Sequence, residues 1–406
     1  MKAKWLPYII FLNLSIAFGS EILRSNDKFA KKLYNVLDTK DKNIIFSPLN
    51  LHTILSIIYT GSVGKTTSVL ERTLGLPAKK YVPNQYKNAL NVLLNEEKAR
   101  NVTLRIANKI YLAKGFQLNN DFKRTVNKDF LAEISTLDLS NSIKTAIKID
   151  RWVQNRTDNK IKRLIDSSSL KKNENKAVHL LLAVSAIYFK GNWVPENAFN
   201  PSKTKRMPFY QNSSRTVHCQ MMSRKGKFLH WASGSMDADF LKLDYDDGRY
   251  SMVIALPQRR DGIDELEAKL AGRDLSILIN RFFPTVMNLQ IPKFKLEATL
   301  DPKLPLRQMG LGRIFANDAN FSEMIRNNGR RLKVTDVKQK VVLEMDEGND
   351  TNGPPNSNIE SYMPPATLIA DHPFIVFITA KLDIQEDCLH WDTVLLMGKV
   401  SSPEEA

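Results

Sequence analysis

The sequence predicts a mixed α+β domain with large antiparallel sheets. Segments with helical spacing dominate the first part of the chain, and segments with strand alternation dominate the later part. Val178 to Phe189 is a nearly continuous apolar run, which is typical of a central strand covered on both faces. The 406 residues suit one large domain or two modest ones, and no internal repeat is visible. Helices segregated from strands in this way indicate an α+β arrangement.

The predicted helices carry apolar side chains on one face at helical spacing. The second helix is opened by Ser47-Pro48, which also ends a short apolar strand at Ile44–Phe46. In chain order, helices are expected at Asn26–Leu37, from Pro48 to Tyr59, at Ser68–Leu76, at Ile147–Leu164 with a turn at Thr157–Lys160, and at Asp264–Leu278.

The predicted strands are short and apolar, and turns such as Asp246-Asp247-Gly248 separate them. The last two are expected to pair with each other. The strands are placed at Val102–Leu112, at Val178–Phe189, in short segments from Phe209 to Leu256, and at Asn288–Leu296, Leu332–Met345, Phe374–Leu382 and Thr393–Val400.

The first 19 residues have the pattern of a signal peptide. Lysines give the positive start, Leu6–Ile16 is the apolar run, and Ala17-Phe18-Gly19 places small residues where cleavage after Gly19 is expected. The apolar run is too short for a transmembrane helix, and no later stretch qualifies. The expected mature protein is residues 20–406, one soluble domain that is secreted to the extracellular space.

The net charge of +16 favours solubility and attraction to polyanions. Because lysines and arginines are spread along the chain, a generally basic surface accounts for this charge. A site for sulfated polysaccharide or for an acidic membrane is the narrower interpretation, with Arg330-Arg331-Leu332-Lys333 as one basic cluster. Nucleic acid is not an expected partner of a secreted protein.

Two cysteines, Cys219 and Cys388, are too few for a disulfide framework. Both lie in apolar strand-like segments, so two buried thiols and one bridge remain equally open. The signal peptide makes glycans an expectation at Asn-x-Ser/Thr sequences. These acceptors are Asn101, Asn155, Asn212, Asn320 and Asn349.

The sequence contains none of the common catalytic or metal-binding motifs: no His-Glu-x-x-His, no paired Cys-x-x-Cys and no Gly-x-Ser-x-Gly. Gly61–Thr66 matches a phosphate-binding loop only in part, because its Lys lacks the upstream spacing, and a turn between helices is predicted there. His52, His179 and His372 are expected to be structural. We therefore expect no enzyme activity, no metal and no cofactor.

A polar stretch near the C-terminus separates two apolar, strand-like segments. Asn349 to Asn358 has almost no apolar side chains and cannot bury itself. A long exposed loop between two strands of a compact domain is usually functional or disordered. This loop is therefore the candidate functional segment.

Many short motifs, in a fixed order over the whole mature length, make the chain resemble the serpin family. The matches include Asn43–Pro48, Gly61–Thr66, Trp152-Val153, Ala186–Trp193, Phe199, Met221-Met222, Tyr245, Leu256-Pro257, Pro292–Phe294, Met309-Gly310, Val342–Glu344, Asp371–Phe374 and Met397–Val400. The resemblance implies a monomeric α+β domain with three β-sheets, eight to nine helices and an exposed reactive-centre loop, here at about residues 348–370. That loop is bait for proteases.

In inhibitory members of the family, the protease cuts this loop, and the part before the cut inserts into the central sheet as a new strand. The resemblance implies that small residues should follow the glycine at the start of the loop. Gly348 matches that glycine, but polar residues and two prolines follow, and proline cannot donate a hydrogen bond inside a sheet. The hinge consists of Glu347, Gly348, Asn349, Asp350, Thr351, Asn352, Gly353, Pro354 and Pro355.

The family also carries a polar cluster beneath the central sheet that controls the opening of that sheet. The matching residues are Ser47, Asn50, Ser185 and Gln339. Relative to the family pattern, Ser and Asn are exchanged between positions 50 and 185, and Gln339 replaces a histidine. We expect a rewired network with paired polar groups; a neutral reshuffle that leaves the sheet mobile is the alternative.

These departures predict a secreted, non-inhibitory serpin-family protein that acts as a protease substrate or binding protein. The alternative is the usual activity of the family, the inhibition of a serine protease. With a loop of the family's length, the reactive-site bond joins Tyr362 and Met363, and Tyr362 suits a chymotrypsin-like protease. A shift of one residue would move the bond to Met363–Pro364, where the proline is poor for cleavage. An extracellular serine protease and a sulfated polysaccharide are the candidate partners.

Overall fold

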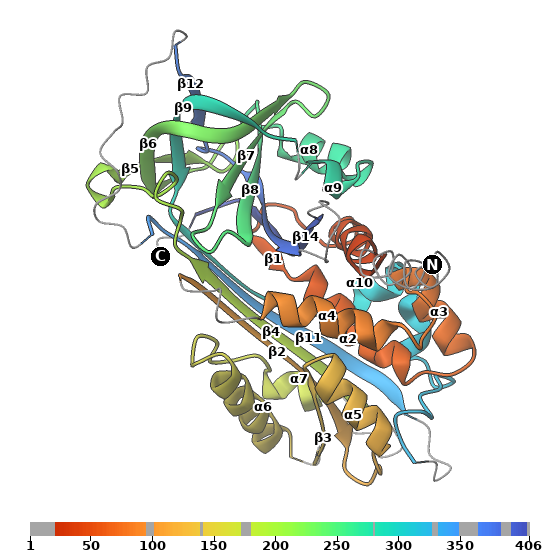
Figure 1. Ribbon diagram of the computed structural model, residues 1–406. Coiled ribbons are helices and arrows are strands. Elements are labelled where there is room, and N and C mark those ends of the chain that lie inside the picture. Colours follow the sequence, from red (N-terminus) through yellow and green to blue (C-terminus); the bar gives the residue numbers. More distant parts are fainter. Residues whose placement is uncertain are drawn as a thin grey trace, which may run out of the picture.

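The computed structural model describes residues 21–94, 101–138, 141–171, 180–278, 281–326, 332–348, 364–382 and 391–403. The predicted signal peptide lies outside these ranges. The described strands form two sheets, and helices pack around them (Figure 1). Within the described ranges, no helix has the length and apolar character needed to cross a membrane.

A five-stranded sheet has the order β10-β11-β4-β2-β3. Its strands are β2 (Val102–Ala113), β3 (Glu133–Leu137), β4 (Leu180–Gly191), β10 (Phe294–Leu300) and β11 (Lys333–Met345). The sequence predicted antiparallel sheets, but β4 and β11 pair in parallel, and so do β2 and β3. Because long stretches of chain separate the members of each pair, no tight turn has to join them, and parallel pairing is allowed.

The second sheet has nine strands. One of them, β6 (Thr216–Ser233), is very long and pairs with different strands along its length. β6 pairs with β5 and β9 through its earlier residues and with β7 through its last. The second sheet thus has two halves, which with the five-stranded sheet account for the three predicted sheets. Its other strands are β1 (Ile44–Phe46), β5 (Lys205–Tyr210), β7 (Ala238–Asp244), β8 (Tyr250–Pro257), β9 (Phe283–Pro292), β12 (Ala366–Ile369), β13 (Phe374–Leu382) and β14 (Trp391–Val400).

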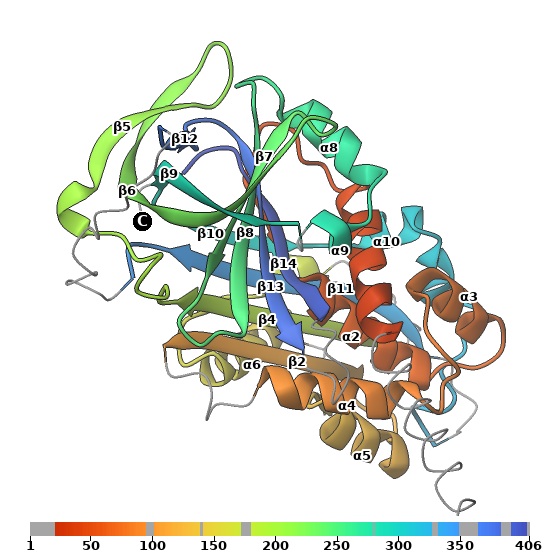
Figure 2. The same ribbon diagram turned by 45° about the horizontal axis from the view of Figure 1, so that its top comes forward.

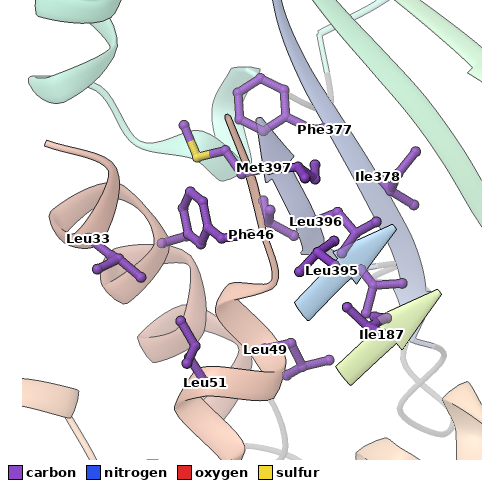
Figure 3. Close-up of a cluster of buried hydrophobic side chains, with 14 of the residues drawn as sticks. Leu33, Phe46, Leu49, Leu51, Ile187, Phe377, Ile378, Leu395, Leu396 and Met397 are labelled. Carbon is purple, nitrogen blue, oxygen red and sulfur yellow. The ribbon is translucent and has the colours of Figure 1, made fainter. Parts of the chain in front are cut away.

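Every residue of α2 (Pro48–Thr60) is buried, and the helix packs against both sheets. Ser47 caps this helix: its Oγ accepts a hydrogen bond from the backbone N–H of Asn50 (3.3 Å). Pro48 takes the first helical position, where no N–H is required. Figure 3 shows the hydrophobic core at this point, to which α2, β4, β13 and β14 all contribute.

α6 (Ser142–Arg156) covers the face of the five-stranded sheet opposite to α2 (Figures 1 and 2). The sequence predicted a helix at Ile147–Leu164, but α6 begins earlier, at Ser142. It ends at Arg156, because Asp158 and Asn159 have left-handed backbone conformations (φ 48° and 60°). The remaining helices are residues 21–34, α3 (Lys65–Leu74), α4 (Val82–Leu93), α5 (Asn120–Asp129), α7 (Ser167–Lys171), α8 (Ile263–Ala271), α9 (Leu275–Leu278) and α10 (Lys303–Gln308), with short 3₁₀ turns at Pro201–Lys203 and Leu311–Phe315.

Candidate functional site

The predicted loop leaves the chain at the end of β11 and returns at β12. Residues 349–363 lie outside the described residues, and so do Tyr362, Met363 and the hinge from Asn349 to Pro355. Both roots of the loop are described. Gly348, at the first root, has a φ of +82°, which glycine adopts without steric strain.

Glu347 is held by three neighbouring segments. Its carboxylate accepts hydrogen bonds from Thr204 Oγ1 (2.9 Å) and Lys293 Nζ (3.1 Å), and its carbonyl oxygen accepts one from the backbone N–H of Phe199 (3.1 Å). Burial alone would raise the pKa of this carboxyl group, but the hydrogen bonds hold it below its ordinary value. Glu347, the first residue of the hinge, is therefore held in place as a carboxylate.

Asp346 joins the ends of β11 and β4. Its carboxylate forms an ion pair with Lys190 (2.7 Å), which lies on β4 opposite Glu344 of β11. Its carbonyl oxygen accepts a hydrogen bond from Trp193 Nε1 (2.8 Å). The hydrogen bond with Asp346 raises the pKa of Lys190. The pKa of Asp346, which burial alone would raise, is lowered by the same contact.

Asp371 and His372 hold the second root of the loop. The Asp371 carbonyl oxygen accepts a hydrogen bond from the backbone N–H of Tyr210 (2.7 Å), and its carboxylate contacts Arg260 Nη2 (2.6 Å). His372 Nδ1 lies 2.8 Å from the Asp371 carboxylate, and its Nε2 lies 2.8 Å from the carbonyl oxygen of Pro257. Both ring nitrogens are thus engaged with acceptors, which agrees with a structural role for this histidine.

The seam between β4 and β11 is closed. The two strands pair directly over 11 residue pairs, from Leu180–Lys333 to Lys190–Glu344. The β4 side of the seam is buried on both faces, for example by Ile187 on one face and Tyr188 on the other. On β11, the outer face carries the half-buried Lys338 and Lys340. A strand that entered this seam would therefore be fully covered on the face toward the main core.

Gln339 and Ser47 of the predicted cluster do meet. The side-chain amide of Gln339 donates to the carbonyl oxygen of Ser47 (3.0 Å), and the backbone N–H of Ser47 donates to Gln339 Oε1 (2.9 Å). The Ser47 hydroxyl donates to the carbonyl oxygen of Leu395 (2.8 Å). These contacts connect the middle of β11 with the start of α2 and with β14.

The other two predicted members are less well paired. Ser185 lies directly opposite Gln339 in the sheet, and Asn50 lies on α2, yet their side-chain polar atoms have no hydrogen-bond partner among the described residues. The complete pairing expected for the cluster is thus found only for Ser47 and Gln339. The structure adds Asn108, which lies opposite Ser185 on β2, is buried and has an unpaired Oδ1. The sequence signal that could have identified Asn108 is a single asparagine at a buried position of the predicted strand Val102–Leu112.

The remaining predicted sites lie apart from this cluster. The acceptors Asn101, Asn155, Asn212 and Asn320 are exposed, and Asn349 lies outside the described residues. Cys219 is a free thiol in β6, and burial raises its pKa to about 11, whereas Cys388 lies outside the described residues. Across the described ranges, no group of His, Cys, Asp and Glu side chains has an arrangement that could hold a metal ion.

A family model described as "Serpin (serine protease inhibitor)" matches residues 24–403. The chain belongs to the serpin family. This serpin is 31% identical to Serine protease inhibitor 42Dd of Drosophila melanogaster, over 92% of this chain and 95% of the relative.

Solved structures agree with this assignment. The structure of Cleaved Serpin 42Da matches this serpin with a TM-score of 0.80 and 28% identity, over 95% of this chain and 100% of that chain. Human thyroxine-binding globulin complexed with its hormone has a TM-score of 0.80 at 24% identity, over 94% of this chain and 98% of that chain, which shows a shared fold alone. The serpin fold predicted from the sequence is confirmed.

Proposed function

We propose that this serpin is secreted and non-inhibitory: its reactive loop is bound or cut by a protease but does not insert efficiently. The observation that carries the proposal is the closed seam of 11 residue pairs between β4 and β11. A strand that filled this seam from the loop root would begin after Gly348 and would extend to about residue 359. It would therefore contain all of Asn349 to Pro355.

Those residues are poorly suited to the seam. Pro354 and Pro355 have no N–H. Each of them, once inserted, would therefore leave a carbonyl oxygen of the neighbouring strand, β4 or β11, without a hydrogen-bond donor. On the face of the seam that lies in the main core, an inserted Asn or Asp side chain without a partner would cost about 1–3 kcal/mol. If insertion is slow or incomplete, the cleaved serpin would be released as an ordinary product, and the protease would remain active.

The alternative function is the inhibition of a chymotrypsin-like serine protease after a cut between Tyr362 and Met363. One observation favours it: this serpin is 31% identical to the relative named Serine protease inhibitor 42Dd. The two functions differ in one step, the insertion that follows cleavage.

A denaturing gel after incubation with chymotrypsin separates the two functions. We expect cleaved serpin and no SDS-stable complex of summed mass; such a complex would overturn the proposal. A matched variant, in which Asn349, Asp350, Asn352, Pro354 and Pro355 are replaced by alanine, is expected to form the complex and to gain thermal stability on cleavage. If the variant also stays a substrate, the hinge is not the cause.

Secretion and polyanion binding are parts of the same proposal that need separate tests. The signal-like residues 1–19 and the exposed Asn-x-Ser/Thr acceptors support secretion, and the net charge of +16 supports binding to sulfated polysaccharide. Expression in eukaryotic cells should place a glycosidase-sensitive protein in the medium. Retention on a heparin column at physiological salt would support the polysaccharide, and elution in the flow-through would exclude it.

A further inference from the structure

α6 presents two large apolar side chains to solvent. Ile143 and Ile147 are 56% and 54% exposed, and they are neighbours because they stand one helical turn apart. The other side of the helix is anchored, since Ile149 and Val153 are fully buried against the five-stranded sheet. The two exposed isoleucines therefore stand on a helix whose other side is well packed. Figures 1 and 2 show that this helix lies on the outside of the molecule.

Cationic side chains flank the two isoleucines. Lys144, Lys148 and Arg151 are exposed, and none of them forms an ion pair within the described part of the chain. Arg156, at the end of the same helix, differs because it pairs with Glu133 (2.5 Å). Among the described residues, the charge beside Ile143 and Ile147 is therefore not neutralised by an ion pair.

The acidic residue of α6, Asp150, is half-buried and engaged with backbone N–H groups. Asp150 accepts hydrogen bonds from the backbone N–H groups of Leu164 (2.8 Å) and Ile165 (3.2 Å), in the segment that follows the helix. That segment adds the exposed cations Lys162 and Arg163. The outer side of α6 thus combines apolar tips with unpaired positive charge.

We propose that the α6 face, formed by Ile143, Lys144, Ile147, Lys148 and Arg151, binds the surface of an anionic lipid bilayer. Apolar side chains on such a face enter the boundary between headgroups and acyl chains, while Lys and Arg remain with the phosphates. α6 lies on the outside of the described part of the molecule, and its cations complement negatively charged lipid. This binding is additional to the role of the reactive loop.

The isoleucines separate this proposal from simple polyanion binding. A sulfated polysaccharide would be bound through the cations, and the exposed apolar side chains would contribute little to it. A lipid surface uses both. The decisive variant is therefore Ile143→Gln/Ile147→Gln, which keeps every charge and changes two exposed positions of a helix.

The test is co-sedimentation of the full-length protein with vesicles of phosphatidylcholine mixed with phosphatidylserine, and with vesicles of phosphatidylcholine alone. We expect binding to the mixed vesicles only. The double isoleucine variant should bind about tenfold more weakly, and Lys144→Gln/Lys148→Gln should lose a similar factor. Leu304→Gln is the matched control, because Leu304 is an equally exposed aliphatic residue (65%) on α10, and it should bind as the parent does.

Two results would overturn the proposal: failure of the parent to bind mixed vesicles, or equal binding by the parent and the double isoleucine variant. An unchanged melting temperature should show that the variant is folded, and retention on heparin should be the same for these two proteins because the variant keeps its charge. Asn155 lies one turn beyond Arg151 and is a glycan acceptor. The proteins are therefore compared in an Asn155→Gln background, so that a sugar cannot mask the surface.

Discussion

Gln339 of β11 binds both polar backbone groups of Ser47, the residue that caps α2. Its side-chain amide donates to the Ser47 carbonyl oxygen at 3.0 Å, and its Oε1 accepts the Ser47 N–H at 2.9 Å. Both residues are completely buried. One side chain therefore satisfies a donor and an acceptor that water cannot reach, and it joins the central sheet to the buried helix.

Replacement of Gln339 by alanine should destabilise the fold strongly. The change leaves the N–H and the carbonyl oxygen of Ser47 buried with fewer partners and creates a cavity, so we expect a loss of about 2–4 kcal/mol of unfolding free energy. Urea denaturation measures it, with an unchanged m-value as the sign of an unchanged transition. Gln220→Ala, at an exposed position of β6, is the matched control and should change stability by less than about 0.5 kcal/mol. Equal effects of the two changes would contradict the role of Gln339.

Ser185→Ala should not lower the unfolding free energy, in contrast to Gln339→Ala. The Ser185 hydroxyl is buried without a hydrogen-bond partner among the described residues, so its removal should be neutral or should stabilise the fold by up to about 1 kcal/mol. Ser56→Ala is the contrasting variant, because the buried Ser56 Oγ lies 3.0 Å from Tyr86 Oη, and it should cost about 1 kcal/mol. Thermal melts of both variants decide the matter. A clear loss of stability for Ser185→Ala would mean that its hydroxyl is paired in solution.

Gly348→Ala tests the geometry of the loop root. Gly348 has a φ of +82°, and an added Cβ would lie 3.1 Å from Trp193 Cδ1, so strain and crowding together should cost about 1–2 kcal/mol. Gly234→Ala is the control, because a Cβ there meets no atom within 4 Å and its φ is not in the left-handed range. If both variants melt at the same temperature, the root is not held in the conformation described.

The sequence predicted the buried parts of the fold well, because burial leaves a strong local pattern. The start signal Ser47-Pro48 correctly placed α2, and the apolar run ending at Phe189 correctly placed β4. α4 and α5 were missed. α5 buries only Phe122 and Val126 within an otherwise polar segment, whereas α4 buries five residues at helical spacing that the sequence analysis did not recognise. The predicted helix Asp264–Leu278 is two helices, α8 and α9, with a break at Gly272–Asp274 that periodicity alone did not reveal.

The contacts of the candidate site depended on information that lies outside any one segment. Family motifs identified Ser47 and Gln339 as neighbours, but not that Gln339 would bind the backbone of Ser47. Asn108 lies opposite Ser185 because β2 and β4 pair in a register that brings together residues 77 positions apart in the sequence. A one-residue slip would have turned this side chain to the other face of the sheet, so such neighbours cannot be read from local sequence.

Asp27 should make stability fall as the pH rises toward neutrality. It is buried, its Oδ1 accepts hydrogen bonds from the Val394 N–H and the Thr393 hydroxyl (both 3.0 Å), and its Oδ2 has no partner among the described residues. Burial raises the pKa of this carboxyl group from 3.8 to about 7. The folded protein therefore binds the proton more tightly than the unfolded chain does, and the stabilisation is complete below about pH 4 and is lost as the pH rises through about 7.

Asp27→Asn should remove this dependence. Asparagine retains an acceptor for Val394 and Thr393 and carries no charge, so the variant should be more stable than the parent at pH 8 by about 2–4 kcal/mol and close to it at pH 4. Carboxyl groups with lowered pKa values, such as Asp346 and Glu347, act in the opposite direction, because their stabilisation is lost as the pH falls. The informative quantity is therefore the difference between variant and parent in urea unfolding across this pH range. The exposed Asp261→Asn should show no such difference, and a flat difference for Asp27→Asn would mean that Asp27 is already charged in the folded protein at low pH.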